Sequence, residues 1–305
     1  MDIVTIVLIV SGLVLFETVS SIDNAVINAE VLSTMSQKAR RWFLLWGLFI
    51  AVFLLRGLLP WAIVWVVNPS LGPIGSFTAA LSSNPAVAEA IESSKHILLA
   101  GGGIFLIFLF FHWLFLEPKN FGLRGEKFFQ KQGVWFYAIV SIILAAVVWF
   151  SIKIDPLMAF GAVVGSTAFF ITHGFKENAA QAEKKLLGKG DTSLTDASKI
   201  LYLEVIDATF SIDGVVGAFA FTLSVPLILL GNGIGALVVR QMTISNIDRI
   251  KRYVFLKNGA MYSIFFLGSI MLLDSFGLHI PSWLSPVTTA LIIGYFFLKS
   301  RNALR

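Results

Sequence analysis

Long apolar runs alternate with short polar stretches along the whole chain. Nine runs stand between charged residues, glycines or prolines, and most have the roughly 17 to 25 residues that a transmembrane helix needs. They cover 3–33, 42–67, 95–116, 134–152, 156–174, 199–222, 226–243, 258–276 and 284–299. The pattern predicts an all-α integral membrane protein with about nine transmembrane helices.

The composition agrees with a membrane protein and excludes several other classes. Hydrophobic residues make up 57% of the 305 residues and charged residues 13%, about half the charged share of a soluble domain. Cysteine is absent, which excludes disulfides and thiolate metal sites. The net charge of +5 belongs to basic loops, so we expect contact with a lipid bilayer and no nucleic-acid partner.

Lysine and arginine mark every second loop. They follow the first, third, fifth, seventh and ninth apolar runs, whereas the alternate loops hold only Lys95 and Lys153. By the positive-inside rule the N-terminus lies outside and the C-terminus lies in the cytoplasm of a plasma (inner) membrane protein. The hydrophilic stretch 174–198 is the expected cytoplasmic linker between a first half, 1–173, and a second half, 199–305.

One acidic signature occurs twice inside the apolar runs, with copies 190 residues apart. The copies read Glu17-x-x-x-Ser21-Ile22-Asp23-Asn24 and Asp207-x-x-x-Ser211-Ile212-Asp213-Gly214. On the predicted topology the two copies cross the membrane in opposite directions, as in inverted-topology transporters with ion sites on discontinuous helices. We therefore expect an inverted repeat whose first helix is broken or kinked at the signature in each half.

Carboxylates in hydrocarbon are costly unless something pairs with them, and a duplicated set suggests a cation. Carboxylate and amide oxygens suit hard divalent ions, whereas softer metals favour the thiolates and imidazoles that both signatures lack. We predict a site for Mn²⁺, Ca²⁺ or Mg²⁺ made of Glu17, Asp23, Asn24, Glu204, Asp207 and Asp213, with hydroxyl oxygens from Ser21 and Ser211.

The helical period leaves the position of Asp23 open. Glu17, Ser21 and Asn24 share one helix face, but Asp23 is turned away by about 120°. Asp23 joins the same pocket if the helix unwinds around Ser20 and Ser21, or else it faces a neighbouring helix.

The summed negative charge of the predicted carboxylates exceeds the charge of one divalent ion. Some of them must therefore be protonated or paired with a cationic side chain. Arg56, near the bilayer centre, is the expected charge-balancing partner. Close carboxylates raise one another's pKa, which makes proton exchange against metal the coupling hypothesis. Asn28, Asn232 and Arg240 are candidates for the ion pathway.

Both signatures resemble motifs of the TerC-type integral membrane proteins, a family named for tellurium resistance. The matching stretches are Glu17-x-x-x-Ser21-x-Asp23-Asn24-Ala25 and Glu204-x-x-Asp207-x-x-Phe210-Ser211-x-Asp213, with Asn232 and Arg240 at the spacings of that family. Asp213-Gly214 is similar to the DUF475 branch. The TerC-type proteins belong to the LysE-like transporter superfamily and include manganese exporters. The resemblance implies that the six oxygen-bearing residues carry Mn²⁺ out of the cytoplasm.

The function expected from these features is secondary transport of a metal ion, with protons as the expected counter-ion, and not enzymatic catalysis. The chain has no His-Glu-x-x-His motif, no nucleophile arrangement and no Walker A sequence, so hydrolase chemistry and direct ATP-driven pumping lack a motif. The alternative is a membrane scaffold whose structural metal aids metal homeostasis or tellurite resistance without flux.

Overall fold

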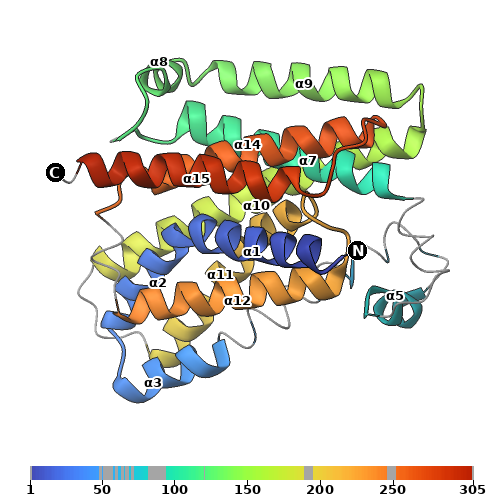
Figure 1. Ribbon diagram of the computed structural model, residues 1–305. Helices are drawn as coiled ribbons and strands as arrows, with labels where there is room; N and C mark the ends of the chain where they lie inside the picture. The colour runs from blue at the N-terminus through green and yellow to red at the C-terminus, as the bar shows by residue number, and fades with distance from the viewer. Residues whose placement is uncertain are drawn as a thin grey trace.

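Helices account for the regular structure of the computed structural model (Figure 1). The structure describes residues 2–47, 50, 58, 61–62, 65, 69, 72–81, 94–119, 121–188, 195–245 and 252–303. Within these ranges there are twelve α-helices, one π-helix and no strand. The helices are α1 (Ile3–Ser20), α2 (Ile22–Ser33), α3 (Gln37–Trp42), the π-helix η1 (Phe43–Gly47), α5 (Gly72–Leu81), α7 (Lys95–Leu116), α8 (Glu126–Lys131), α9 (Trp135–Ser151), α10 (Pro156–Gly188), α11 (Asp196–Ala218), α12 (Val225–Ser245), α14 (Leu256–Ser275) and α15 (Leu284–Ala303).

Five helices in the described ranges are long and apolar enough to cross a membrane. They are α1, α7, residues Pro156–Asn178 of α10, residues Val225–Thr243 of α12, and α14. The chain is therefore a multi-pass membrane protein. Helices α9, α11 and α15 occupy three further predicted segments, and α11 interrupts its apolar sequence with Glu204, Asp207 and Asp213. Most of the predicted segment 42–67 lies outside the described residues.

Helices from the two predicted halves pack against each other. Helix α7 of the first half packs along α14 of the second half and along α10, while α1 packs along α12. Figure 1 shows α7, α14 and α15 in one layer, with α1 and α12 beside it. Helix α10 continues to Gly188, so the stretch predicted as a linker begins as helix.

Glycines let α7 and α10 approach each other closely. A Cβ added at Gly161 would lie 2.7 Å from the carbonyl oxygen of Ile97, and one added at Gly165 would meet the backbone of Gly101. In both places the obstacle is main chain, which cannot rotate away as a side chain can. This contact therefore depends on residues without a side chain.

We expect Gly165→Ala to destabilise the protein by about 1 to 3 kcal/mol, because the added methyl group forces α7 and α10 apart. Denaturant unfolding in detergent micelles measures the change. Gly174→Ala is the matched control on the same helix, since a Cβ there meets nothing within 4 Å. Equal stability of the two variants would contradict this account of the helix contact.

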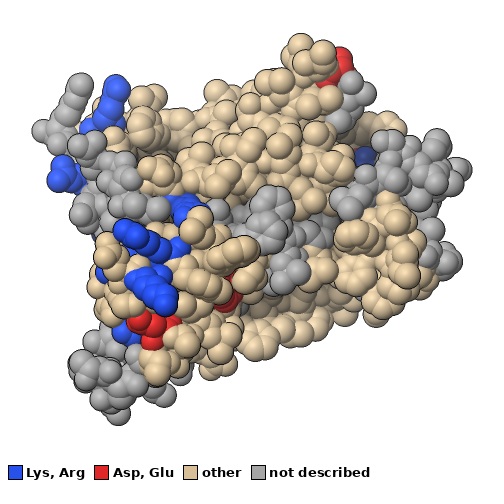
Figure 2. All heavy atoms as spheres, turned by 90° about the horizontal axis from the view of Figure 1, so that it is seen from below, with Lys and Arg blue, Asp and Glu red and all other residues tan. Residues whose placement is uncertain are grey.

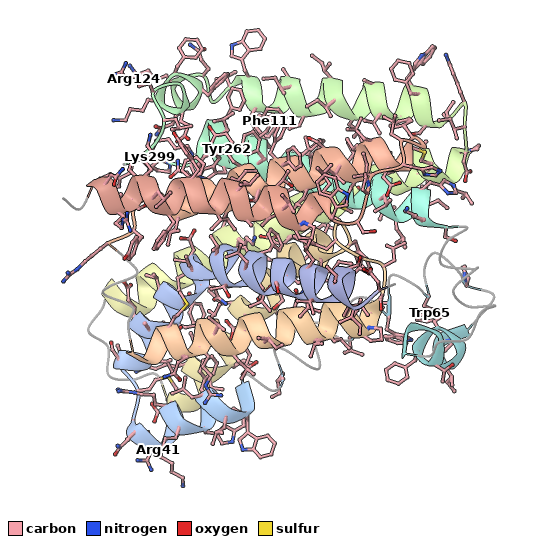
Figure 3. All side chains as sticks on the ribbon, in the orientation of Figure 1. Arg41, Trp65, Phe111, Arg124, Tyr262 and Lys299 are labelled. Atoms are coloured by element: carbon pink, nitrogen blue, oxygen red, sulfur yellow. The ribbon has the colours of Figure 1, made fainter. Side chains whose placement is uncertain are left out.

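Positive charge gathers at one end of the bundle. Figure 2 shows blue Lys and Arg side chains concentrated at the end where the C-terminus lies in Figure 1. Arg41, Arg124 and Lys299 lie at this basic end, and Trp65 lies at the opposite end (Figure 3). The arrangement agrees with the alternation of basic loops.

The opposite end of the bundle, where α7 begins, carries paired charges. Lys95 Nζ lies 3.0 Å from Asp274 Oδ2, and His96 Nε2 lies 2.6 Å from Asp155 Oδ2. The hydrogen bond from His96 lowers the pKa of Asp155. These contacts join α7 to α14 and to the turn before α10.

Candidate functional site

The first signature lies at a break between two helices. Helix α1 ends at Ser20 and α2 begins at Ile22, with Ser21 between them at φ −89° and ψ 6°. The Ser21 hydroxyl donates a hydrogen bond to Glu17 Oε1 over 2.9 Å. The chain thus breaks where the sequence analysis expected, and the break turns a hydroxyl toward a buried carboxylate.

The second signature lies on an unbroken helix, so the break expected in the second half is absent. Helix α11 runs from Asp196 to Ala218, and the Ser211 hydroxyl donates to the Asp207 carbonyl oxygen over 2.6 Å. This local bond leaves the helical ladder in place. Gly214 and Gly217 lie against Glu17 and Phe16, so these glycines provide close packing and not unwinding.

The two signatures cross each other antiparallel. Asn24 Nδ2 donates to Asp207 Oδ1 over 2.6 Å, and a Cβ added at Gly214 would lie 2.5 Å from Glu17 Oε2. Residue numbers rise along one helix as they fall along the other. Glu17 and Asp207 are equivalent in the two signatures, as are Asn24 and Gly214, so the two contacts join equivalent pairs of positions, as expected for a twofold relation between the signatures.

A cavity of about 60 Å³ lies at this crossing, roughly the volume of two water molecules. We call it the small cavity, and it is lined by Glu17, Ser21, Asn24, Asn28, Leu32, Phe43, Leu44, Asp207, Ala236, Val239, Arg240 and Thr243. Glu17 is 1% exposed and Asp207 is 8% exposed. Two buried carboxylates from different helices therefore line the same cavity.

Asparagine amides supply further oxygen atoms to the small cavity. Asn28 Nδ2 also donates to Asp207 Oδ1, over 2.9 Å. The Oδ1 atoms of Asn24 and Asn28 are buried and accept no hydrogen bond from the described residues. Carboxylate and amide oxygens together form the donor set that hard divalent cations prefer, and they would suit Mn²⁺, Ca²⁺ or Mg²⁺.

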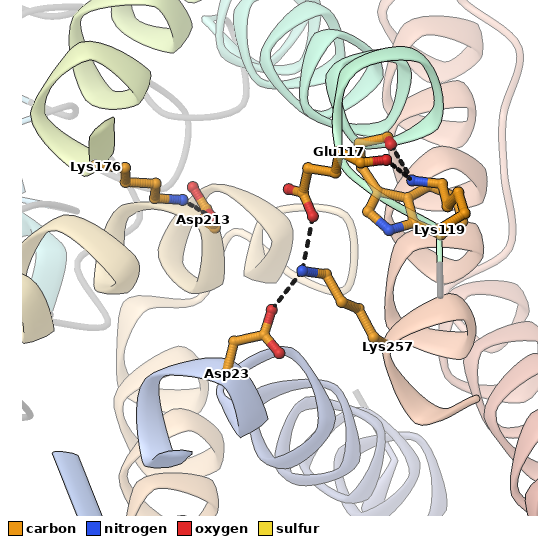
Figure 4. A network of polar contacts seen from close by, with 7 residues as sticks. Asp23, Glu117, Lys119, Lys176, Asp213 and Lys257 are labelled. Carbon is orange, nitrogen blue, oxygen red and sulfur yellow. Dashed lines mark hydrogen bonds and ion pairs between the residues drawn. The ribbon is translucent and has the colours of Figure 1, made fainter. Parts of the chain in front are cut away.

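A second cavity, of about 520 Å³, lies on the other side of the signature helices. We call it the large cavity, and its lining includes Asp23, Asp213, His112, His173, Glu117, Lys176, Glu177 and Lys257. Lys257 Nζ lies 2.8 Å from Asp23 Oδ2 and 2.7 Å from Glu117 Oε2. Lys176 pairs with Asp213. Figure 4 shows both pairings, and Asp23 thus faces the neighbouring helix α14.

The predicted six-residue ligand set divides among three places. Glu17, Asn24 and Asp207 line the small cavity, while Asp23 and Asp213 line the large cavity. Glu204 lies beside Gly47 of η1, and its carboxylate makes no hydrogen bond with the described residues. Nowhere in the described ranges do three or more His, Cys, Asp or Glu side chains converge as a metal cluster.

The remaining candidates have distinct surroundings. Ser211 is 1% exposed and Asn232 is fully buried. Neither amide atom of Asn232 has a hydrogen-bond partner among the described residues. Arg240 lines the small cavity. Arg56 lies outside the described residues, so its charge-balancing role stays a prediction.

Lys176 and Lys257 are the site residues that sequence reasoning missed. Lys257 was counted only as a basic residue of a cytoplasmic loop, and Lys176 was interpreted as an interfacial residue at the cytoplasmic end of the fifth apolar run. Neither role predicts contact with a signature carboxylate. In the structure they neutralise the second carboxylate of each signature. The excess of carboxylates over one divalent ion was the only signal that such partners were needed.

The basic end of the signature helices is tied together by polar contacts. Ser36 Oγ donates to Asp196 Oδ2 over 2.5 Å, and Lys199 Nζ donates to the Thr34 carbonyl oxygen over 2.9 Å. The hydrogen bond from Ser36 lowers the pKa of Asp196. The chain after α2 is thereby held to the start of α11.

Comparison with protein families identifies one match. A family model described as "Protein of unknown function (DUF475)" matches residues 22–305. The match begins inside the first signature, so it covers most of the lining of both cavities but not Glu17 or Ser21. No curated protein and no solved structure gives a significant match.

Proposed function

The chain belongs to the DUF475 family, whose function is unknown, and we propose that it is a secondary transporter that exports a hard divalent cation. The proposed ion is Mn²⁺, and the proposed binding site is the small cavity. Ca²⁺ and Mg²⁺ prefer the same oxygen donors and are the competing ions.

One observation carries the proposal: two buried carboxylates on antiparallel helices, Glu17 and Asp207, line one cavity. Carboxylate oxygens are ligands that a hard divalent cation prefers. The buried Oδ1 atoms of Asn24 and Asn28, without hydrogen-bond donors among the described residues, add two neutral oxygen ligands. The Nδ2 atoms of the same amides donate to Asp207, which limits the cost of burying its charge.

The direction and the ion rest on the resemblance to TerC-type proteins, which include manganese exporters. The proposed topology has nine transmembrane helices, an inverted repeat, an outside N-terminus and a cytoplasmic C-terminus in the inner membrane. It is supported by the twofold relation between the signatures and by the basic end of the bundle. Alternating access would then move the antiparallel signature helices around a fixed site.

Flux measurements in proteoliposomes test the proposal. Mn²⁺, Ca²⁺, Mg²⁺ and Zn²⁺ are compared with and without a pH gradient across the vesicle membrane. We expect protein-dependent Mn²⁺ flux that exceeds Zn²⁺ flux. If protons are the counter-ion, an opposing proton gradient should accelerate the Mn²⁺ flux. Binding of Mn²⁺ without flux would favour the scaffold alternative, and neither binding nor flux would overturn a metal-related function.

Asn232→Leu is expected to stabilise the protein while impairing transport. Removing a buried amide without described partners relieves a desolvation cost of about 1 to 3 kcal/mol. Asn232 lies one helical turn before Ala236 of the small cavity, so flux should fall about tenfold through loss of one polar group on the pathway. Thermal unfolding and Mn²⁺ flux are measured on the same samples.

Asn258→Leu is the matched control for this change. Asn258 is also buried, but its Nδ2 donates to Glu126 Oε2 over 2.8 Å. That variant should be less stable than the wild type, because it leaves Glu126 short of a donor. If Asn232→Leu were destabilised in the same way and kept full flux, a pathway role for Asn232 would be lost.

A further inference from the structure

A third cavity, of about 180 Å³, lies at the end of the bundle where α7 begins, opposite the basic end. We call it the outer cavity, because the proposed topology places this end outside the cell. Lys95 and Asp274, the ion pair that joins α7 to α14, line it. Ile9 of α1, Phe221 and Ser282 also contribute to its wall. Neither acidic signature reaches this cavity.

Helix α1 leads from the outer cavity to the small cavity. Ile9 lines the outer cavity and Glu17 lines the small cavity, eight residues or about 12 Å further along the helix. Leu13 lies halfway between them, and spacings of four residues put all three on one face of α1. Leu13 is 0% exposed. Apolar packing therefore separates the two cavities along this face.

Two phenylalanines complete the separation between the cavities. A Cβ added at Gly217 of α11 would lie 2.5 Å from the Phe16 ring, and one added at Gly12 of α1 would lie 2.9 Å from the Phe221 ring. Each ring thus lies against the glycine that stands four residues before the other ring. The ring centroids are 5.8 Å apart. We call Leu13, Phe16 and Phe221 the plug.

The plug is a closed apolar constriction. Phe16 is 1% exposed and Phe221 is 4% exposed, and none of the three side chains has a polar atom that could replace the water around an ion. Leu13 lies against Gly231 of α12, where an added Cβ would be 2.5 Å from Leu13 Cβ. An apolar constriction of this kind excludes water and ions until it widens.

Building on the proposed function, we propose that the outer cavity is the exit of the ion pathway and that the plug is the gate between it and the small cavity. The gate is closed in this structure. Export requires the three side chains to move aside after a cation has entered the small cavity. The glycines that face the rings leave the helix backbones free of side chains that would have to move with them.

Thiol accessibility tests the gate. The chain has no cysteine, so a single introduced cysteine is its only thiol. Ala236→Cys adds a thiol to the lining of the small cavity, and Ser282→Cys adds one to the lining of the outer cavity. Sealed spheroplasts that produce each variant are exposed to Ag⁺, a small membrane-impermeant ion that blocks thiols. The protein is then unfolded, and the remaining free thiols are measured with a maleimide.

Ag⁺ added from outside should block Ser282→Cys but not Ala236→Cys, because the closed plug lies between the two positions. Adding Phe16→Ala or Phe221→Ala should make the block of Ala236→Cys at least about tenfold faster, since smaller side chains open the constriction to water and ions. Phe108→Ala is the matched control. Phe108 is also 1% exposed, but it lies in the contact between α7 and α10, so Ala236→Cys should stay protected.

Equal rates of block for Ala236→Cys with the intact plug and with both alanine variants would overturn the inference. Should neither alanine variant fold, Phe221→Leu takes their place with the same expected direction, because it shortens the side chain and keeps it apolar. If Ser282→Cys reacts only in inside-out vesicles, the same comparison is made from that face.

The labelling needs no Mn²⁺, so its outcome is separate from that of the flux measurement. Mn²⁺ flux together with unchanged labelling would overturn the gate alone. Opening of the plug to Ag⁺ in a protein that moves none of the divalent ions would overturn the proposed function and not the gate.

Discussion

Asp207→Asn is expected to reduce Mn²⁺ flux roughly 100-fold or more, because the small cavity then keeps only one of its two carboxylates. Asparagine has the shape of aspartate and can still accept hydrogen bonds from Asn24 and Asn28, which now donate to Asp207. The variant should therefore fold, and its loss of flux should come from weaker Mn²⁺ binding. Proteoliposome flux and Mn²⁺ calorimetry measure the two effects separately.

The matched control is Glu30→Gln, which removes a carboxylate from an exposed position of α2. It should transport like the wild type, whereas Glu17→Gln should fail as Asp207→Asn does. Equal loss in both site variants is expected from the twofold relation between Glu17 and Asp207. Wild-type flux in Asp207→Asn would mean that the small cavity is not the transport site.

Much of the fold follows from local sequence. The apolar run 95–116 predicts the bounds of α7, Lys95–Leu116, because charge and proline end the run on its C-terminal side. The break at Ser21 also follows, since adjacent Ser20 and Ser21 offer side-chain hydrogen bonds that compete with the helix. These features depend on residues close together in the chain.

The lysines that pair with Asp23 and Asp213, the second carboxylates of the two signatures, could not be predicted in this way. The apolar run ends at 174, but α10 continues to Gly188 because the polar residues that follow are good helix formers. Lys176 therefore lies within α10, beyond the end of the apolar run. Similarly, α14 begins at Leu256, before the predicted 258, and so includes Lys257.

Helical periodicity predicted that Asp23 faces away from Glu17. It did not predict which residue Asp23 contacts. Choosing between unwinding and a neighbouring helix requires the packing of α14, which lies more than 200 residues later in the chain. The division of each signature between two cavities is a consequence of tertiary packing. A single sequence holds no local signal for it.

Gly214 was another residue whose role depends on packing. As a sequence feature it suggested a deformable backbone, but in the structure it lets α11 approach the Glu17 carboxylate. Gly235 of α12 lies against the same side chain, because a Cβ added there would be 2.7 Å from Glu17 Cβ. Glu17 is therefore held between two glycines on different helices.

Gly214→Ala is expected to weaken Mn²⁺ binding about 10- to 100-fold, the range seen when the groups that orient a metal ligand are disturbed. The new Cβ would lie 2.5 Å from Glu17 Oε2, so the carboxylate would have to shift from its place in the small cavity. Alanine favours a helix over glycine, so reduced helix stability would not explain the loss. Calorimetry with Mn²⁺ gives the affinity, and thermal unfolding of the same samples checks the fold.

Gly174→Ala is the control, because it makes the same substitution in α10 where a Cβ meets nothing within 4 Å. It should bind Mn²⁺ as the wild type does. Gly235→Ala, which presses on Glu17 from the opposite side, should reproduce the weakened binding of Gly214→Ala. Wild-type affinity in both Gly214→Ala and Gly235→Ala would show that the position of the Glu17 carboxylate does not govern binding, and the small cavity would then lose its central ligand.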